Sequence, residues 1–197
     1  MATLGNKKTG LFFGSFNPIH VGHLIIANHM VEHTDLEEVW FVISPHSPFK
    51  QKASLLADHQ RFALVNYAVE DHPNLWASNI EFGLPQPSYT SLTLAFLAEK
   101  YPNKEFSLIM GEDNLIHIDQ WKNADFILNN YPIYVYPRPN IELSKFHQYP
   151  NVHIVKDVPQ MDISSSFIRK CIKEHKDTRY LLPHRVYEYV KEMHFYE

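Results

Sequence analysis

Short apolar runs rich in β-branched and aromatic residues alternate with segments of helical periodicity along the whole chain. The run from Val39 to Ile43 is continuous, which is typical of a parallel strand covered on both faces. Strands that alternate with helices in this way predict an α/β fold, most simply a doubly wound parallel sheet of the Rossmann type. The expected strands span residues 9–13, 36–44, 75–82, 105–110, 133–136 and 152–155.

The helical segments carry apolar residues at spacings of three and four. In the first of them Leu24, Ala27 and Val31 recur at this spacing, so one face is expected to pack on the sheet. Asp58 stands where it can cap the second helix. The expected helices span residues 22–33, 58–70, 89–100, 116–128, 164–174 and 184–193.

No internal repeat, low-complexity run or linker divides the 197 residues. A chain of this length that folds as one unit can bury roughly 70% of the surface of its unfolded state. We therefore expect a single domain over residues 1–197, in which the last two helices form a C-terminal addition to the sheet.

The overall charge and the lengths of the apolar runs restrict the partners. The formal net charge of −4 argues against a surface for nucleic acid, which usually has a basic excess. The apolar runs are far shorter than the roughly 20 residues of a membrane span. Cys171 is the only cysteine, so no internal disulfide can form, and no charged and apolar leader precedes the first strand. We expect a cytoplasmic protein that binds neither membrane nor nucleic acid, and the oligomeric state is unknown from the sequence.

In doubly wound sheets, ligands bind beyond the carboxyl ends of the strands. The segments richest in glycine and polar residues follow the predicted strands, so we expect them to share one edge of the sheet. These segments are residues 14–23, residues 45–52, residues 111–114, Arg138 and residues 164–169.

The first of these segments reads Gly14-Ser-Phe-Asn-Pro-Ile-His-Val-Gly-His23 and joins a strand to a helix. The free N–H groups and the dipole of a helix N-terminus attract anions. Gly14 and Gly22 would leave room for a phosphate, and His20 and His23 could donate hydrogen bonds to it. Two other interpretations stay open: a structural turn with satisfied histidines, and a zinc site, although no nearby cysteine or carboxylate completes its ligand set.

The last of these segments places three consecutive serines ahead of an amphipathic helix. Ser165 and Arg169 are four residues apart, so they share one face of that helix. A single serine would suffice to cap the helix. Three hydroxyls, free amides and an arginine would also hold a polyphosphate, so capping and phosphate binding both stay open.

Both segments resemble motifs of the nucleotidyltransferase superfamily of adenylyl- and cytidylyltransferases. Residues 14–23 resemble its G-x-F-x-P-x-H-x-G-H motif, and residues 163–169 resemble its I-S-S-T-x-I-R motif. Further stretches resemble the bacterial nicotinate-nucleotide adenylyltransferases, so that the resemblance spans nearly the whole chain. These stretches are Pro87-Ser-Tyr-Thr90, Gly111-Glu-Asp-Asn114 followed by Trp121, and Tyr136-Pro-Arg-Pro139.

The resemblance implies the transfer of AMP from ATP to nicotinate mononucleotide, which gives deamido-NAD and pyrophosphate in NAD biosynthesis. It implies Mg²⁺ as the ion that accompanies ATP, and it assigns no side chain as a metal ligand. The implied catalytic residues, which would hold the α-phosphate, are His20 and His23. The implied ATP-binding residues are Gly14, Ser15, Phe16, Gly111, Asp113, Ser164, Ser165, Ser166 and Arg169. The implied residues for the mononucleotide are Lys50, Thr90, Trp121 and Arg138.

The sequence departs from the family pattern at a few positions. Phe13 stands where the family often has a second glycine, and Ser166 replaces the common threonine but keeps the hydroxyl. Phe49 stands where relatives often carry a polar residue, which leaves the contact of Lys50 with the mononucleotide phosphate open. Two alternatives also remain at this stage: a pantetheine-phosphate adenylyltransferase and a non-catalytic nucleotide-binding module.

Overall fold

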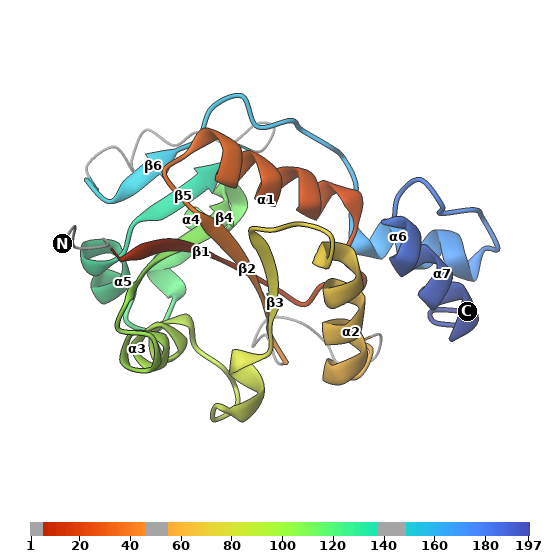
Figure 1. Cartoon of the computed structure of the whole chain (residues 1–197), viewed down its shortest axis with the longest axis horizontal. Coiled ribbons are helices and arrows are strands. Elements are labelled where there is room, and N and C mark those ends of the chain that lie inside the picture. The colour runs from red at the N-terminus through yellow and green to blue at the C-terminus, as the bar shows by residue number, and fades with distance from the viewer. Residues whose placement is uncertain (1–5, 46–54, 138–148) are drawn as a thin grey trace.

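A computed structural model of the chain describes residues 6–45, 55–137 and 149–197. Six strands form one parallel sheet in the order β3-β2-β1-β4-β5-β6 (Figure 1). The strand order reverses between β1 and β4, as in a doubly wound sheet, so the loops that follow these two strands border one crevice. The strands are β1 Lys7–Gly14, β2 Glu38–Ile43, β3 Leu75–Ser78, β4 Lys104–Gly111, β5 Ile133–Tyr136 and β6 Val152–Ile154.

Helices cover both faces of the sheet, and α6 and α7 lie to one side of it, where α7 packs on α2 (Figure 1). Among the described helices, none combines the length and the apolar character that a bilayer crossing requires. The α-helices are α1 Val21–His33, α2 Asp58–Val69, α3 Thr90–Lys100, α4 Glu112–Leu115, α5 Ala124–Asn130, α6 Ser165–Lys173 and α7 His184–Glu192. Two short 3₁₀ helices are η2 Ile80–Gly83 and η3 Ile118–Gln120.

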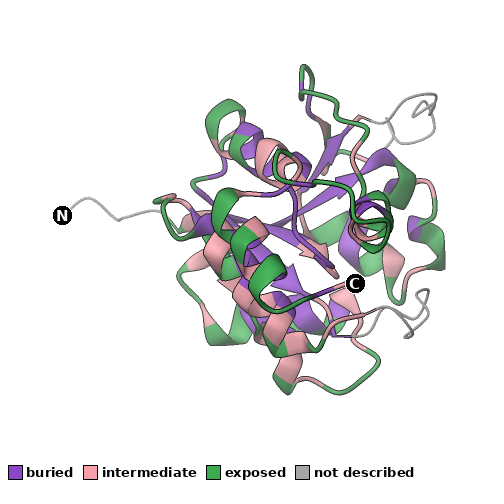
Figure 2. Cartoon of the chain, turned by 90° about the vertical axis from the view of Figure 1, so that its right-hand side faces the viewer, coloured by how far each residue is buried: buried purple, intermediate pink, exposed green. Residues whose placement is uncertain are grey.

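The central strand β1 is buried on both faces, because successive side chains of a strand point to opposite sides. Leu11 packs in one apolar cluster with residues of α3 and α5, whereas Phe12 packs in the other cluster with residues of α1, α2 and α7. Figure 2 shows the buried residues concentrated in the sheet and the exposed residues on the outer sides of the helices. The expected α/β doubly wound fold is therefore confirmed.

Three local predictions were wrong. The strand expected over residues 75–82 ends at Ser78, and η2 follows it. The buried carboxylate of Glu81 in η2 accepts a hydrogen bond from the Thr93 hydroxyl of α3 at 2.7 Å, and this contact draws the segment out of the sheet. The helix expected over residues 116–128 is divided into η3 and α5, because Asn123 adopts a left-handed backbone with φ of 58°.

The third wrong prediction concerns the start of α2. Ala57 occupies the N-cap position, and Asp58 is the first helical residue. The Asp58 carboxylate instead accepts a hydrogen bond from Arg61 at 2.6 Å. Because the Arg61 side chain is fully buried, its charge requires a partner, and Asp58 is the acid within reach.

Candidate active site

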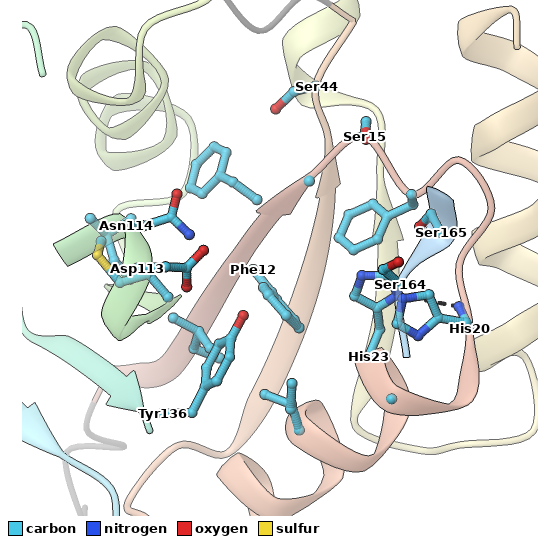
Figure 3. A pocket seen from close by; sticks show the side chains of 18 of the residues that line it. Phe12, Ser15, His20, His23, Ser44, Asp113, Asn114, Tyr136, Ser164 and Ser165 are labelled. Atoms are coloured by element: carbon cyan, nitrogen blue, oxygen red, sulfur yellow. Dashed lines mark hydrogen bonds between the residues drawn. The ribbon is translucent and has the colours of Figure 1, made fainter. Parts of the chain in front are cut away.

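A cavity of about 790 Å³ lies at the carboxyl ends of β1, β4 and β5. Figure 3 shows Asp113 and Asn114 on one side of it and His20, His23 and Ser164 on the other. The two sides are about 50 residues or more apart in the sequence, and the parallel sheet brings them together because all strands end at the same edge. This edge is the one where the sequence predicted the ligand.

The two histidines of the first motif stack on each other at the start of α1. Their ring centroids are 3.7 Å apart, with an angle of 29° between the planes. His20 is the N-cap residue of α1, and its backbone N–H donates to Nδ1 of His23 at 3.2 Å. Because Nδ1 accepts this hydrogen bond, a neutral His23 ring carries its proton on Nε2. Both side chains line the cavity beside the positive end of the helix dipole.

The loop between β1 and α1 turns its backbone carbonyls toward the protein. Arg61 Nη1 donates to the carbonyl oxygen of Ser15 at 2.7 Å. Arg169 Nη1 donates to the carbonyl of Asn17, and the Ser165 hydroxyl donates to the carbonyl of Pro18, both at 2.8 Å. With its carbonyls occupied on the protein side, the loop does not present their negative charge to an anion.

Phe16 explains why residue 14 is a glycine. The Phe16 backbone is left-handed, with φ of 44°, a conformation that stores strain in a bulky residue and clusters at functional sites. The ring is buried and lies edge-on to His23, with centroids 5.2 Å apart. A Cβ at Gly14 would come within 2.8 Å of this ring. Gly14 therefore makes room for the aromatic side chain that supports His23.

The second motif contacts the first directly. Ser164 caps α6, since its hydroxyl accepts from the Phe167 N–H at 3.1 Å. Ser165 and Arg169 hydrogen-bond to the loop residues Pro18 and Asn17, which lie 147 and 152 positions earlier. Arg169 Nη2 also donates to Ser166 Oγ at 3.2 Å. Ser164 and Ser165 line the cavity, whereas Ser166 and Arg169 are not among the described residues that line it.

Gly111 and Asp113 lie at the end of β4, across the cavity from the histidines. A Cβ at Gly111 would stand 2.3 Å from Oδ1 of Asp113 and 3.0 Å from the Tyr136 ring. Gly111 thus permits the close approach of these two side chains, both of which line the cavity. Asp113 is exposed to the cavity at the end of a strand, a position from which acidic residues hold ribose hydroxyls in dinucleotide folds.

The remaining wall contains the residues expected to hold the mononucleotide. Thr90, the first residue of α3, and Trp121 both line the cavity and are half-buried. Lys50 and Arg138 fall outside the described residues, so their expected roles stay predictions. Residues that the sequence analysis did not single out also line the cavity, and their positions at the ends of strands and helices were the available signal. They include Ser44 and Glu81. Asn114 and Tyr136, which belong to stretches that resemble the family, line the cavity as well.

Arg61 is a further residue that the sequence analysis missed. Its side chain is fully buried, and it donates to the carbonyls of Ser15, Ser44 and Leu56 at 2.7, 3.1 and 3.0 Å. Burial lowers the pKa of its guanidinium below the ordinary value, and the contact with Asp58 opposes this shift. No local pattern in the sequence predicts such a contact, because the three carbonyls belong to separate segments.

Comparisons with known proteins agree with this geometry. The family model described as cytidylyltransferase-like matches residues 11–171. A Flavobacterium psychrophilum protein named "Probable nicotinate-nucleotide adenylyltransferase" is 54% identical, over 96% of this chain and 99% of its own length. A protein of the same name from Bacteroides fragilis is 46% identical, over 94% of this chain and 92% of its own length.

The fold also matches solved structures. The Plasmodium falciparum nicotinic acid mononucleotide adenylyltransferase complexed with NaAD superposes with a TM-score of 0.80 at 18% identity, over 96% of this chain and 97% of its own. At this identity the match shows the fold. Together with the family model and the high identity of the bacterial relatives, it establishes that this chain is a nucleotidyltransferase and belongs to the nicotinate-nucleotide adenylyltransferases.

Proposed function

We propose that the chain transfers AMP from ATP to nicotinate mononucleotide at the cavity bordered by β1, β4 and α6, with release of pyrophosphate. The observation that carries this assignment is the contact between two distant segments. Ser165 and Arg169 of α6 hydrogen-bond to the loop that precedes His20, so two helix N-termini with donor side chains border one cavity. Each helix N-terminus attracts an anion, and together they suit a triphosphate.

In this mechanism an oxygen of the mononucleotide phosphate attacks the α-phosphorus of ATP in line, and pyrophosphate leaves. Such a transfer requires positioning and neutralisation of the developing charge rather than a side-chain nucleophile. His20 and His23 would hold the α-phosphate oxygens, with the Nε2 proton of His23 as one donor. The stacking of the two rings keeps both donors beside the α1 N-terminus.

The β- and γ-phosphates are assigned to Ser164, Ser165, Ser166 and Arg169. The Arg169 guanidinium has five N–H donors, and its bonds to Asn17 and Ser166 use two of them. The same side chain can therefore hold the loop and receive phosphate oxygens. Gly14, Ser15 and Phe16 would form the floor of the triphosphate site, and Gly111 and Asp113 would receive the ribose of ATP.

Mg²⁺ is proposed as the ion that ATP brings, where it supplies positive charge to the phosphates. The described residues contain no group of three or more His, Cys, Asp or Glu side chains that could hold a metal. In phosphoryl-transfer sites Mg²⁺ usually keeps several waters and binds mainly to substrate phosphates.

At the other end of the cavity, Thr90 and Trp121 are proposed to receive the pyridine ring, and Lys50 and Arg138 to approach the mononucleotide phosphate. Thr90 is the first residue of α3, where free amides and the helix dipole would favour the nicotinate carboxylate over an uncharged amide. The proposed location is the cytoplasm, where ATP is abundant.

The assignment is tested by incubating the purified protein with ATP and Mg²⁺ and measuring pyrophosphate release. Nicotinate mononucleotide, nicotinamide mononucleotide and phosphopantetheine are supplied in separate reactions. We expect the highest kcat/KM with nicotinate mononucleotide. Release with phosphopantetheine alone would favour the pantetheine-phosphate adenylyltransferase, and ATP binding without release would favour a nucleotide-binding module.

A further inference from the structure

The segment that follows α7 contacts the loop between β1 and α1, which carries Asn17. The hydroxyl of Tyr196 donates to Oδ1 of Asn17 at 2.8 Å, across 179 positions of sequence. The same oxygen accepts from the Leu56 N–H at 3.2 Å. Asn17 is buried, with 3% of its surface exposed, so both hydrogen bonds are shielded from water. The Asn17 side chain is thus held by Tyr196 of the C-terminal segment and by Leu56, which precedes α2.

Tyr196 is itself fixed by packing. The neighbouring Phe195 is buried and contacts the Tyr189 ring of α7, with centroids 5.7 Å apart. The Phe195 N–H donates to the carbonyl of Val190 at 3.0 Å, and the Tyr196 backbone is left-handed, with φ of 71°. A left-handed tyrosine persists only where surrounding contacts impose it. The hydroxyl is therefore presented to Asn17 by an ordered segment.

The contacts from α6 and the C-terminal segment converge on the same five residues, 17–21. Besides the bonds of Ser165 and Arg169, the Val21 N–H at the start of α1 donates to the carbonyl of Leu181 at 3.1 Å. Tyr196, which lies beyond α7, contacts the Asn17 side chain. This loop leads directly into His20, the N-cap of α1.

We propose that Tyr196 is a positioning residue for nucleotidyl transfer: by fixing Asn17 it fixes the loop that carries His20, without touching the substrates itself. The proposal rests on the proposed function of the cavity. Tyr196 is not among the described residues that line the cavity, so it acts through Asn17. Tyr196 would change the rate through the alignment of the reacting groups, because small displacements of these groups lower the rate by large factors.

The Tyr196 hydroxyl remains a donor over the working range of pH. Burial raises its pKa above the ordinary value of 10.0, although the charges of Arg169 and Arg61 act in the opposite direction. The hydroxyl is therefore protonated at neutral pH, and the hydrogen bond to Asn17 does not titrate there.

The first test replaces Tyr196 with phenylalanine, which keeps the ring and removes the hydroxyl. We expect kcat for pyrophosphate release to fall by about tenfold, with the KM for ATP and the unfolding midpoint close to those of the wild type. Tyr189→Phe is the matched control, since Tyr189 also packs on Phe195 and its described ring contacts are with Tyr67 and Phe195. A kcat of Tyr196→Phe within twofold of the wild type, like that of the control, would overturn the proposal.

The second test asks whether Tyr196 acts through Asn17. In an Asn17→Ala background, Tyr196→Phe should change kcat by less than twofold, because coupled residues are not additive. Equal effects of Tyr196→Phe in both backgrounds would contradict the proposal. If the wild-type chain itself releases no pyrophosphate with any acceptor, the proposed function fails, which is distinct from an active wild type with an unaffected variant.

A readout independent of turnover is amide hydrogen exchange over residues 15–24. We expect faster exchange in Tyr196→Phe than in the wild type, and wild-type exchange in Tyr189→Phe. Unchanged exchange in Tyr196→Phe would show that the hydroxyl does not hold the loop, and it would overturn the proposal even if kcat fell.

Discussion

At the residue scale, the candidate site contains two stacked imidazoles, and a backbone N–H contacts one of them. The His20 N–H fixes the tautomer of a neutral His23 ring, and the two rings stack at 3.7 Å. Phe16 lies edge-on to His23, and Gly14 leaves the space that the Phe16 ring occupies. Gly14, Phe16 and His20 thus each help to fix the position of His23.

Removal of either imidazole should reduce turnover. We expect His20→Ala or His23→Ala to lower kcat by about 10²–10³-fold, the usual cost of losing one donor to a developing charge. Steady-state pyrophosphate release measures the effect, and far-ultraviolet circular dichroism checks the fold. For His23, substitution with asparagine is a useful comparison, because an amide oxygen can still accept from the His20 N–H. Near-normal turnover in both alanine variants would remove the proposed role.

Even the addition of one methyl group at Gly111 should disturb the candidate ATP site. In Gly111→Ala the new Cβ would collide with Oδ1 of Asp113 and press on the Tyr136 ring, so the acid must move. We expect the KM for ATP to rise about tenfold or more, because a displaced acid loses its alignment with the ribose. Gly83→Ala is the control, since no atom lies within 4 Å of its Cβ position. Equal KM values for the two variants would contradict the assignment of Asp113.

At the element scale, a buried acid joins three strands at the edge opposite the cavity. Glu38 of β2 is 3% exposed and accepts from Lys7 and Thr9 of β1, both at 2.8 Å, and from Lys104 of β4 at 2.5 Å. Burial alone would raise its pKa, but the hydrogen bonds from Lys104, Lys7 and Thr9 outweigh burial and hold the pKa below the ordinary value of 4.5. The central three strands are thus tied together by one ionised group.

This group makes the stability of the sheet depend on pH. Because the folded-state pKa is lowered, the contribution is complete above the unfolded-state pKa and is lost as pH falls through the folded-state value. We expect the free energy of unfolding to decrease below about pH 4.5. Glu38→Gln should reduce stability at pH 7 by about 2 kcal/mol and flatten this decrease. Urea denaturation at pH 7 and pH 3.5 measures both, and an equally steep decrease in the variant would exclude Glu38 as its source.

At the scale of the whole molecule, the site is assembled from segments that meet only in the folded state. The fully buried Arg61 donates hydrogen bonds to three backbone carbonyls. They belong to Ser15 in the loop after β1, Ser44 just after β2 and Leu56 just before α2. Ser165 and Arg169 of α6, and Tyr196 beyond α7, supply further hydrogen bonds to the same loop. The loop between β1 and α1 is therefore contacted by distant parts of the chain, from Leu56 and Arg61 to Tyr196.

Arg61→Lys should show whether the hydrogen-bonding geometry of the guanidinium, rather than its positive charge alone, stabilises the fold. A lysine keeps the positive charge, but its ammonium cannot reproduce the planar fork of a guanidinium, so buried carbonyls lose their donors. We expect a loss of about 2–4 kcal/mol in the free energy of unfolding, since each unsatisfied buried group costs about 1–3 kcal/mol. Chemical denaturation measures the loss. Arg185→Lys, which affects an exposed pair with Glu70, should cost about 1 kcal/mol or less, and a similar cost at both positions would contradict this account.

The amino-acid sequence determined the alternation of strands and helices, the edge of the sheet at which the cavity lies, and the residues of the two motifs. The first two features follow from local periodicity and spacing, which report burial and backbone conformation over short distances, whereas the motif residues were identified by their resemblance to the nucleotidyltransferases. Only the tertiary structure decided that Arg61 and Tyr196 hydrogen-bond to the loop between β1 and α1, that Asp58 pairs with Arg61 instead of capping α2, and that the segment after Ser78 leaves the sheet to meet Thr93. Each of these contacts joins side chains whose proximity depends on how the helices pack, and no local pattern encodes that packing.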